Sequence, residues 1–209
     1  MTEQKNPGTT RAYRMGRRLE TLEETRERIA KATYELHATI GPAKTTISAV
    51  AERAGVQRHT VYNHFPDLAS LFRACTEHGM RVTRVPDPAT WPAIPDPVER
   101  LRAGLDEIYG YYRVNARLMG NILRDAPLFA DVGGSEAYDD RIAQMYAALT
   151  DGWTVSDAVR PSLKAAIGHA MAFETWRSLT EPGLSDDQAR KMMVGFVTGI
   201  AAAGGAPAT

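Results

Sequence analysis

The chain has few of the residues from which covalent or metal-dependent sites are built. Its 209 residues include one cysteine, Cys75, which rules out an internal disulfide and any zinc site made of several cysteines. No apolar run approaches the roughly 20 residues that a membrane-spanning helix needs. The polar N-terminus also lacks the apolar core of a signal peptide. We therefore expect a cytoplasmic protein with no metal site, no cofactor and no membrane partner.

The sequence has no net charge, but its two parts differ. Residues 1–81 hold 13 Lys and Arg against 9 Asp and Glu, whereas residues 82–209 hold 12 against 16. The two net charges are therefore +4 and −4. A basic first part on a neutral protein indicates that this part alone meets a polyanion, although so small an excess is only supporting evidence.

Helical periodicity runs along the chain, and no segment alternates as a strand would. Residues 85–97 contain five prolines, which cannot lie inside a helix, so we place a domain boundary there. We predict an all-α protein with an N-terminal helix-turn-helix domain and a C-terminal helical domain. The predicted parts are a flexible basic arm (1–18), the helix-turn-helix domain (19–66), a connecting helix (67–84), a proline-rich linker (85–97) and the C-terminal domain (98–209).

The predicted helices cover about 20–40, 47–54, 57–63 and 67–82, and then about 98–114, 116–125, 135–151, 160–180 and 186–201. Thr46 and Asp96 are placed as N-caps, and Ser185 forms a capping box with Gln188. Cys75 falls in an apolar pattern, so we expect a buried, inert thiol. The predicted core of the N-terminal domain consists of Ile47, Val50, Ala54, Val61, Phe65, Leu68 and Leu71.

The segment AERAGVQRHTVYNHF, residues 51–65, has the pattern of a helix-turn-helix. Gly55 stands where the chain must turn sharply, and glycine reaches positive φ without steric cost. Val56 and Val61 would anchor the second helix, so that its polar side chains project outward. Arg58 can donate two hydrogen bonds to guanine, and Asn63 can pair with adenine in the same way. We predict DNA contacts at Lys44, Thr45, Thr46, Gln57, Arg58, His59, Thr60, Tyr62, Asn63 and His64.

Other interpretations of this segment are weaker. His59 and His64 are five residues apart, which does not suit two metal ligands on one helix face, and no carboxylate or cysteine completes a set. No nucleophile and base can be paired, so we expect no enzyme activity. A solvated polar surface on a small helix stays open as the plain alternative.

Residues 25–72 resemble the DNA-binding domain of the TetR family of bacterial transcriptional regulators. The resemblance implies that the chain binds double-stranded operator DNA, that its C-terminal domain binds a small effector, and that its last two helices pair with a second subunit. The matching features are Ile29, Leu36, Gly41, Thr46, the run AxxAGV at 51–56 and the element Tyr62-x-His64-Phe65.

Two positions depart from the family pattern. Gln57 stands where the family usually has a Ser or Thr that caps the recognition helix, and Gln is a poor N-cap. Leu68 stands where the family usually has a lysine that reaches a phosphate, so one expected backbone contact is missing. The arginines of residues 1–18 could compensate for it.

The C-terminal domain offers aromatic and methionine side chains that could line a ligand pocket, although such side chains also build ordinary helical cores. We expect His169 to share a helix face with Phe173 and Trp176, at i+4 and i+7. The predicted ligand-binding residues are Tyr109, Tyr112, Met119, Met145, His169, Phe173 and Trp176, and the predicted dimer interface consists of Met192, Met193, Phe196, Val197 and Ile200.

The leading hypothesis is a dimeric repressor that a small hydrophobic ligand releases from a pseudo-palindromic operator. The same family also allows a transcriptional activator or a ligand-independent regulator. An enzyme that the N-terminal domain targets to DNA, or a helical interaction module that binds no nucleic acid, are the alternatives from other classes.

Deletion of residues 1–18 tests whether the arm compensates for Leu68. We expect weaker binding to specific and to random DNA by a similar factor, and a shallower salt dependence, because phosphate contacts carry no sequence information. Fluorescence anisotropy over a series of salt concentrations measures both. A truncated chain with unchanged affinity and salt slope would show that the arm contributes nothing.

Overall fold

The computed structural model describes residues 7–132 and 136–203, and all regular elements in these ranges are helices, which confirms the predicted all-α class. The chain forms two compact units. The first unit contains residues 1–81 and 121–133, and the second contains residues 82–120 and 134–209. No helix in the described ranges is both long and apolar enough to span a membrane.

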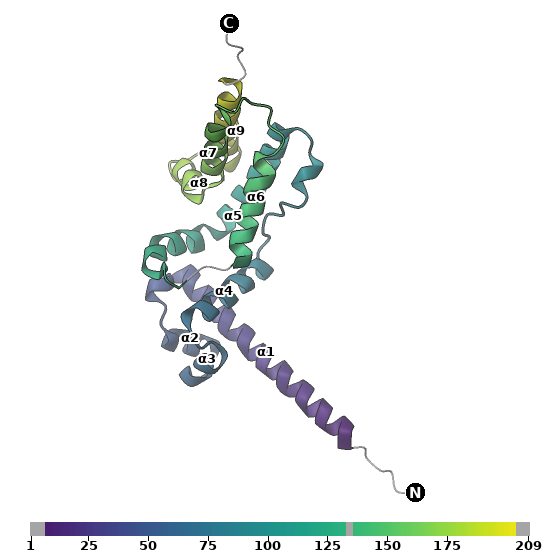
Figure 1. Ribbon diagram of the computed structural model, residues 1–209. Coiled ribbons are helices and arrows are strands. Elements are labelled where there is room, and N and C mark those ends of the chain that lie inside the picture. Colours follow the sequence, from purple (N-terminus) through teal and green to yellow (C-terminus); the bar gives the residue numbers. More distant parts are fainter. Residues whose placement is uncertain (1–6, 133–135, 204–209) are drawn as a thin grey trace. The chain divides into compact units, whose positions relative to one another are not determined.

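The first unit is built on a long helix, α1, with two short helices beside its C-terminal half (Figure 1). Helix α1 begins at Pro7, whereas the predicted start was near residue 20. Proline suits the first position of a helix, and the Arg, Ala and Met residues that follow favour one. Of the predicted arm, residues 1–6 lie outside the described residues. The elements are α1 (Pro7–Thr39), η1 (Pro42–Lys44), α2 (Ile47–Ala54), α3 (Arg58–His64), α4 (Leu68–Val82) and η3 (Ala126–Phe129).

The core of the first unit joins α1 to α2, α3 and α4. Ile29 of α1, Val50 of α2 and Val61 of α3 are fully buried. Phe65 and Leu71 are 2% exposed, and Cys75 is buried as predicted. The prediction that Leu68 belongs to this core was wrong, because Leu68 is 42% exposed. It is the first residue of α4, and side chains in a helix lean toward its N-terminus, so Leu68 projects past the end of the helix.

A tight loop after α1 is held by the segment at residues 121–125. The amide of Asn121 donates to the carbonyl oxygens of His37 and Ala38, at 3.0 and 3.1 Å. The Asp125 carboxylate accepts the backbone N–H of Ala43 at 3.0 Å. Gly41 lies between these contacts with φ 90° and ψ 158°, a conformation that only glycine adopts readily. These contacts explain why residues 121–133 belong to the first unit.

The second unit contains η2 (Trp91–Ala93), α5 (Pro97–Asp125) up to Gly120, α6 (Glu136–Thr150), α7 (Arg160–Met171), α8 (Phe173–Thr180) and α9 (Asp186–Ala203). The helices predicted separately at 98–114 and 116–125 form one continuous helix, α5, in which the side-chain amide of Asn115 donates to the Tyr111 carbonyl one turn back. Residues 133–135, between η3 and α6, lie outside the described residues.

The single helix predicted at 160–180 was also wrong, because the backbone of Ala172 is extended, with φ −70° and ψ 136°. The break frees carbonyl groups at the end of α7, and two tyrosines of α5 satisfy them. The Tyr109 hydroxyl donates to the Ala170 carbonyl at 2.9 Å, and the Tyr112 hydroxyl donates to the Met171 carbonyl at 2.7 Å.

The proline-rich segment is an integral part of the second unit. Trp91 is 1% exposed, and its indole N–H donates to one Glu107 carboxylate oxygen at 3.1 Å. The other Glu107 oxygen accepts the Asp87 backbone N–H at 3.1 Å. Arg141 donates to the Pro86 carbonyl at 2.8 Å. The irregular backbone of this segment is thus fixed by side chains of α5 and α6.

The predicted helix caps are confirmed. The Thr46 hydroxyl accepts the Ala49 N–H at 3.1 Å. The Asp96 carboxylate accepts the N–H of Val98 at the start of α5 at 2.7 Å. The predicted capping box at the start of α9 forms in both directions, with Ser185 and Gln188 each accepting the other's backbone N–H, at 3.2 and 2.9 Å.

Replacing Gly41 by alanine should destabilise the first unit by at least about 3 kcal/mol. A Cβ at Gly41 would collide with the Arg124 guanidinium and lie 2.6 Å from the Asp125 carboxylate oxygen that holds Ala43. Gly55→Ala is the matched control, because Gly55 also has positive φ but a Cβ there meets no atom within 4 Å. It should cost only about 1–2 kcal/mol. Urea unfolding measures both, and equal costs would contradict the account of the loop.

Candidate nucleic-acid interface

The turn between α2 and α3 has the predicted glycine geometry. Gly55 ends α2 in the left-handed region, with φ 65° and ψ 39°, and its N–H donates to the Glu52 carbonyl at 3.1 Å. The Val56 N–H donates to the Ala51 carbonyl at 2.9 Å, which closes the end of α2. Helix α3 then begins at Arg58. The helix-turn-helix predicted from the sequence is present (Figure 1).

Helix α3 buries one side and exposes the other. Val61 is fully buried, and Phe65 follows the helix with 2% exposure. Gln57 takes the N-cap position without a side-chain hydrogen bond, in agreement with its poor capping ability. Among the predicted contacts on this helix, Thr60 and His64 are half-buried, and the exposed ones are Gln57, Arg58, His59, Tyr62 and Asn63.

Two arginines of α1 hold the ends of the short helices. Arg26 donates to the His64 carbonyl at 3.1 Å, and its guanidinium carbon lies 4.4 Å from the centre of the Phe65 ring. Arg28 donates to the Ala54 carbonyl at 3.1 Å. Both contacts satisfy carbonyls that a helix C-terminus leaves open. Sequence reasoning missed these arginines, because their role depends on how α1 crosses α2 and α3 rather than on spacing within α1.

Three predicted DNA contacts, Lys44, Thr45 and Thr46, lie just before α2, and they differ in whether the fold already uses their side chains. The side chain of Lys44 is exposed. The Thr45 hydroxyl donates to the Gly41 carbonyl at 2.8 Å, so it helps to fix the loop after α1. The Thr46 hydroxyl is the cap of α2. Lys44 is therefore the member of this group with a side chain able to extend toward a phosphate.

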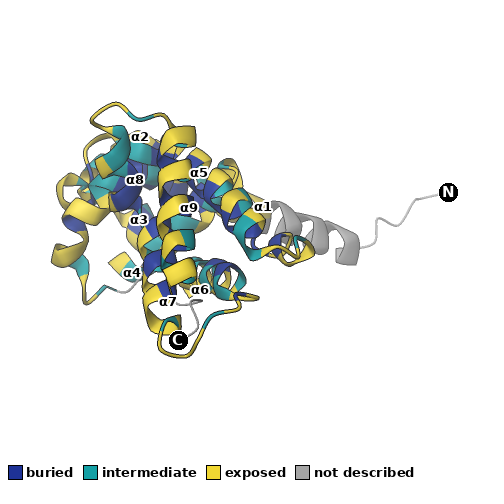
Figure 2. Ribbon diagram, turned by 90° about the horizontal axis from the view of Figure 1, so that it is seen from above, coloured by how far each residue is buried: buried dark blue, intermediate teal, exposed yellow. Residues whose placement is uncertain are grey.

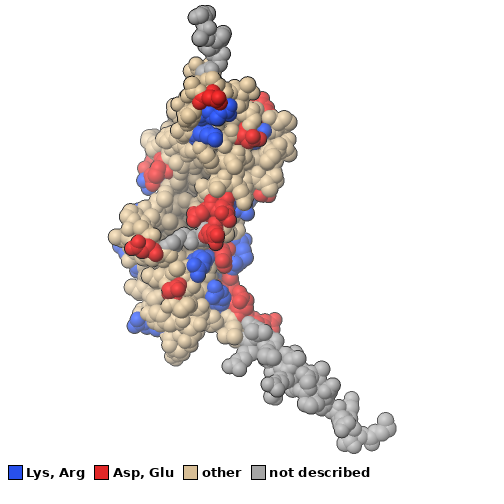
Figure 3. Space-filling model, in the orientation of Figure 1, with Lys and Arg blue, Asp and Glu red and all other residues tan. Residues whose placement is uncertain are grey.

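Charge is distributed without a single dominant patch on one face of the molecule. In the view of Figure 3, Lys and Arg side chains of the described residues lie among Asp and Glu side chains. Among the described residues, no group of three or more His, Cys, Asp or Glu side chains is placed to hold a metal ion.

Comparison with known proteins finds a family model that matches this part of the chain. The sequence model described as "Bacterial regulatory proteins, tetR family" matches residues 29–75, which include α2, α3 and the parts of α1 and α4 that pack on them. Residues 29–75 are therefore similar to the N-terminal domain of the TetR family of bacterial regulators. The matched segment contains the helix-turn-helix of α2 and α3, as the resemblance implied. None of the curated proteins matches the chain as a relative.

Solved structures of TetR-family regulators share its fold. The secondary repressor NalD of the MexAB-OprM multidrug efflux pump of Pseudomonas aeruginosa matches with a TM-score of 0.55 and 19% identity, over 85% of this chain and 96% of NalD. A TetR transcription regulator from Haloarcula marismortui matches with a TM-score of 0.51 and 21% identity, over 87% of this chain and 98% of its own. Sequence identities this low show that the fold is shared and show nothing further about this chain.

The side chains predicted to bind a ligand are mostly packed against one another. Tyr109, Tyr112, Met119, Met145, Phe173 and Trp176 are all at most 8% exposed in the core of the second unit. His169 is exposed and contacts the ring of Phe196, with centroids 6.3 Å apart. It does not share a helix face with Phe173 and Trp176 as predicted, because the break at Ala172 separates them. Burial raises the pKa of both Tyr109 and Tyr112.

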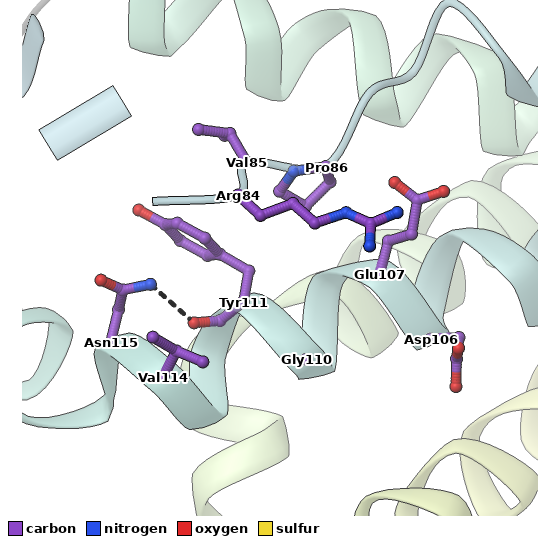
Figure 4. A pocket seen from close by; sticks show the side chains of 9 residues that line it. All are labelled: Arg84, Val85, Pro86, Asp106, Glu107, Gly110, Tyr111, Val114 and Asn115. Atoms are coloured by element: carbon purple, nitrogen blue, oxygen red, sulfur yellow. Dashed lines mark hydrogen bonds between the residues drawn. The ribbon is translucent and has the colours of Figure 1, made fainter. Parts of the chain in front are cut away.

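A cavity of about 320 Å³ lies elsewhere in the second unit, between the segment at 84–86 and one side of α5 (Figure 4). The Arg84 guanidinium extends toward Glu107 in this view, and the Tyr111 ring lies beside the Arg84 chain. Sequence reasoning missed it because its wall includes a proline-rich segment that was taken for a linker. The residues lining it include Arg84, Val85, Pro86, Glu107, Tyr111 and Val114.

Helix α9 exposes one side and buries another (Figure 2). Met192 and Phe196 are 49% and 46% exposed. Met193 and Val197 belong to the core of the second unit, and Ile200 is half-buried against it. The five residues predicted for the dimer interface are therefore divided between the two sides.

Tyr112→Phe should destabilise the second unit by about 1–2 kcal/mol, because it leaves the buried Met171 carbonyl without its donor. Tyr146→Phe is the control, since the Tyr146 hydroxyl donates to the Lys164 carbonyl at an exposed position where water can replace it. It should change stability by less than about 0.5 kcal/mol. Thermal unfolding compares the variants, and a Tyr112→Phe protein as stable as the wild type would argue against the capping role.

Proposed function

We propose that this protein is a dimeric repressor that binds a pseudo-palindromic operator and leaves it when a small hydrophobic ligand binds. The observation that carries the proposal is the recognition helix α3, which buries Val61 and presents polar side chains on a surface held by α1. Repression is our preferred direction because the fold matches that of NalD, a secondary repressor of a multidrug efflux pump.

In this proposal α3 enters the major groove. Arg58 and Asn63 are exposed and have the side chains that pair with guanine and adenine through two hydrogen bonds. Tyr62 is 50% exposed and would contact a phosphate from the same helix. Lys44, before α2, would meet the backbone on the other side of the turn. Leu68 is exposed at the family's usual lysine position and offers no such contact.

We place the dimer contact on the exposed side of α9. Met192 and Phe196 supply apolar surface there, next to Gly195 and Gly199. A Cβ at either glycine would meet no atom of this chain within 4 Å, so the fold of one subunit does not require glycine there. Small residues on an exposed apolar face allow a second helix to approach closely, and a two-fold pair would use the same surface twice.

We place the effector in the cavity beside α5, which has the size of a small ligand site. Its apolar walls come from Val85, Pro86 and Val114, and Arg84 would orient a polar group of the ligand. Helix α5 supplies part of this cavity, and its last turn carries Asn121 and the other residues that hold the loop after α1 in the first unit. A ligand that favours one position of α5 would therefore favour one state of the DNA-binding unit.

An activator or a ligand-independent regulator of the same family is the second candidate. Both would use the same α3 and the same dimer. A ligand-released repressor differs from a ligand-independent regulator in that its ligand must bind the free and DNA-bound states unequally.

Arg58→Ala should weaken binding to a selected operator by roughly tenfold to a hundredfold and leave binding to random DNA nearly unchanged, because the lost contact is to base edges. Arg53→Ala is the matched control, since Arg53 is exposed on α2 and pairs with Glu35 of α1 at 2.9 Å. Fluorescence anisotropy on both DNAs measures the effect. Equal losses for the two variants, or no loss for Arg58→Ala, would count against α3 as the reading helix.

Phe196→Asp should convert the dimer to a monomer at micromolar concentration, because it places a charge at the centre of the proposed contact. Leu128→Asp places the same charge at a side chain that is 71% exposed in the first unit and should leave the dimer intact. Light scattering coupled to gel filtration gives the mass of each. A Phe196→Asp protein that remains dimeric would move the interface away from this side of α9.

A further inference from the structure

The first unit contains a second cavity, of about 160 Å³, that the proposed effector site does not use. It lies under the start of α2, among α1, α4 and η3, and its walls are mainly apolar. An apolar cavity of roughly 150 Å³ holds a molecule the size of benzene. The residues on which the argument rests are His37, Ile47, Leu68, Leu71, Phe72 and Phe129.

His37 gives this cavity an unused polar atom. The side chain is 3% exposed, and its Nδ1 lies 3.6 Å from the Cys75 sulfur. Nε2 has no hydrogen-bond partner among the described residues. Leaving a buried polar atom unpaired is costly, so such atoms in folded proteins usually have a partner. Because Nδ1 is occupied by Cys75, Nε2 is the ring nitrogen available to a molecule in the cavity.

The imidazole of His37 is neutral near pH 7, since burial lowers its pKa to about 4 against a smaller opposing effect of Asp125. A neutral imidazole has one nitrogen that donates and one that accepts, depending on the tautomer. A hydroxyl group can do either, so it pairs with Nε2 in both tautomers. A carboxylate or an ammonium group would instead have to leave water without an opposite charge to meet it.

The walls of the cavity favour an aromatic ring. Phe72 stands edge to face with His37 and with Phe129, at centroid distances of 5.1 and 5.2 Å. Aromatic rings pack well in this arrangement, and another flat ring can add to it. Leu68 also lines the cavity and is 42% exposed, so it forms an apolar rim where a lysine would place a charge.

We propose that this cavity is a binding site for a small, uncharged, monocyclic aromatic alcohol of the size of phenol, with its hydroxyl on His37 Nε2 and its ring between Leu71, Phe72 and Phe129. The unusual Leu68 is part of this site. The ligand is distinct from the larger effector proposed for the second unit, because the cavity has about half the volume of the one beside α5.

A ligand here would also act on DNA binding, a step that rests on the proposed function. Thr45 and Ile47 line the cavity and lie at the start of α2, next to the expected phosphate contacts. The occupied cavity would hold the start of α2 in one position. We expect that position to differ from the one that fits DNA, so that phenol lowers operator affinity.

Nuclear magnetic resonance of the full chain, followed at the His37 ring, tests the site with phenol and toluene as probes. We expect saturable binding of one phenol per chain, about tenfold tighter than toluene, because only phenol can pair with Nε2. His37→Leu should remove this preference. Phenol that binds no more tightly than toluene, or that binds His37→Leu equally well, would overturn the assignment.

Two further variants block the cavity in different ways, so the test does not depend on the correct folding of any single variant. Leu71→Phe fills the interior and Leu68→Trp covers the rim, and each should weaken phenol binding at least tenfold. Leu22→Trp is the control for Leu68→Trp, because Leu22 is 49% exposed on α1 and does not line the cavity. Circular dichroism establishes that each variant is folded. Unchanged binding in a folded Leu71→Phe or Leu68→Trp protein would contradict the site.

Measuring operator binding in the presence of phenol tests separately whether an occupied cavity weakens DNA binding. Phenol should lower the operator affinity of the wild type by a factor that Leu71→Phe abolishes. Resonance shifts at His37 without any change in operator affinity would refute the coupling and leave the site standing. A chain that bound no DNA at all would refute the proposed function, and the phenol titration would still report on the cavity.

Discussion

A helix of seven residues is too short to be stable in water by itself, and α3, the helix that we propose reads DNA, has that length. Its position therefore depends on what α1 provides. Val61 and Phe65 are buried in the core beside Ile29, and Arg26 of α1 takes the carbonyl of His64 at the end of α3. Val61 and Phe65 anchor the helix, and its exposed positions carry Arg58, Tyr62 and Asn63.

In the second unit, aromatic residues that were predicted to line a ligand pocket instead hold the helices together. Tyr109 and Tyr112 donate their hydroxyls to carbonyls at the end of α7, and Trp176 donates to Asp186 at the start of α9. These groups hold the helices of the core together and are not available to a ligand. The cavity described in this unit is lined by different residues, between α5 and the segment that contains Pro86.

The parts of the fold that could be predicted depend on local chemistry. The turn at Gly55, the caps at Thr46 and Asp96, and the outward side of α3 follow from residue types at fixed spacing. The missed features depend on distant contacts. The break at Ala172 has no proline or glycine to signal it, and the carbonyls that it frees are satisfied from α5. The place of Asn121 in the first unit likewise depends on its contact with the end of α1.

Selection of bound sequences from random double-stranded DNA tests the central claim most directly. If two copies of α3 act together, the enriched sequences will be pseudo-palindromes whose half-sites lie about one helical turn, roughly 34–36 Å, or a multiple of it apart. Repeating the selection with hydrophobic small molecules should then reduce the enrichment. Recovery of no common sequence, or of a single half-site without a symmetric partner, would contradict a dimeric operator-binding repressor.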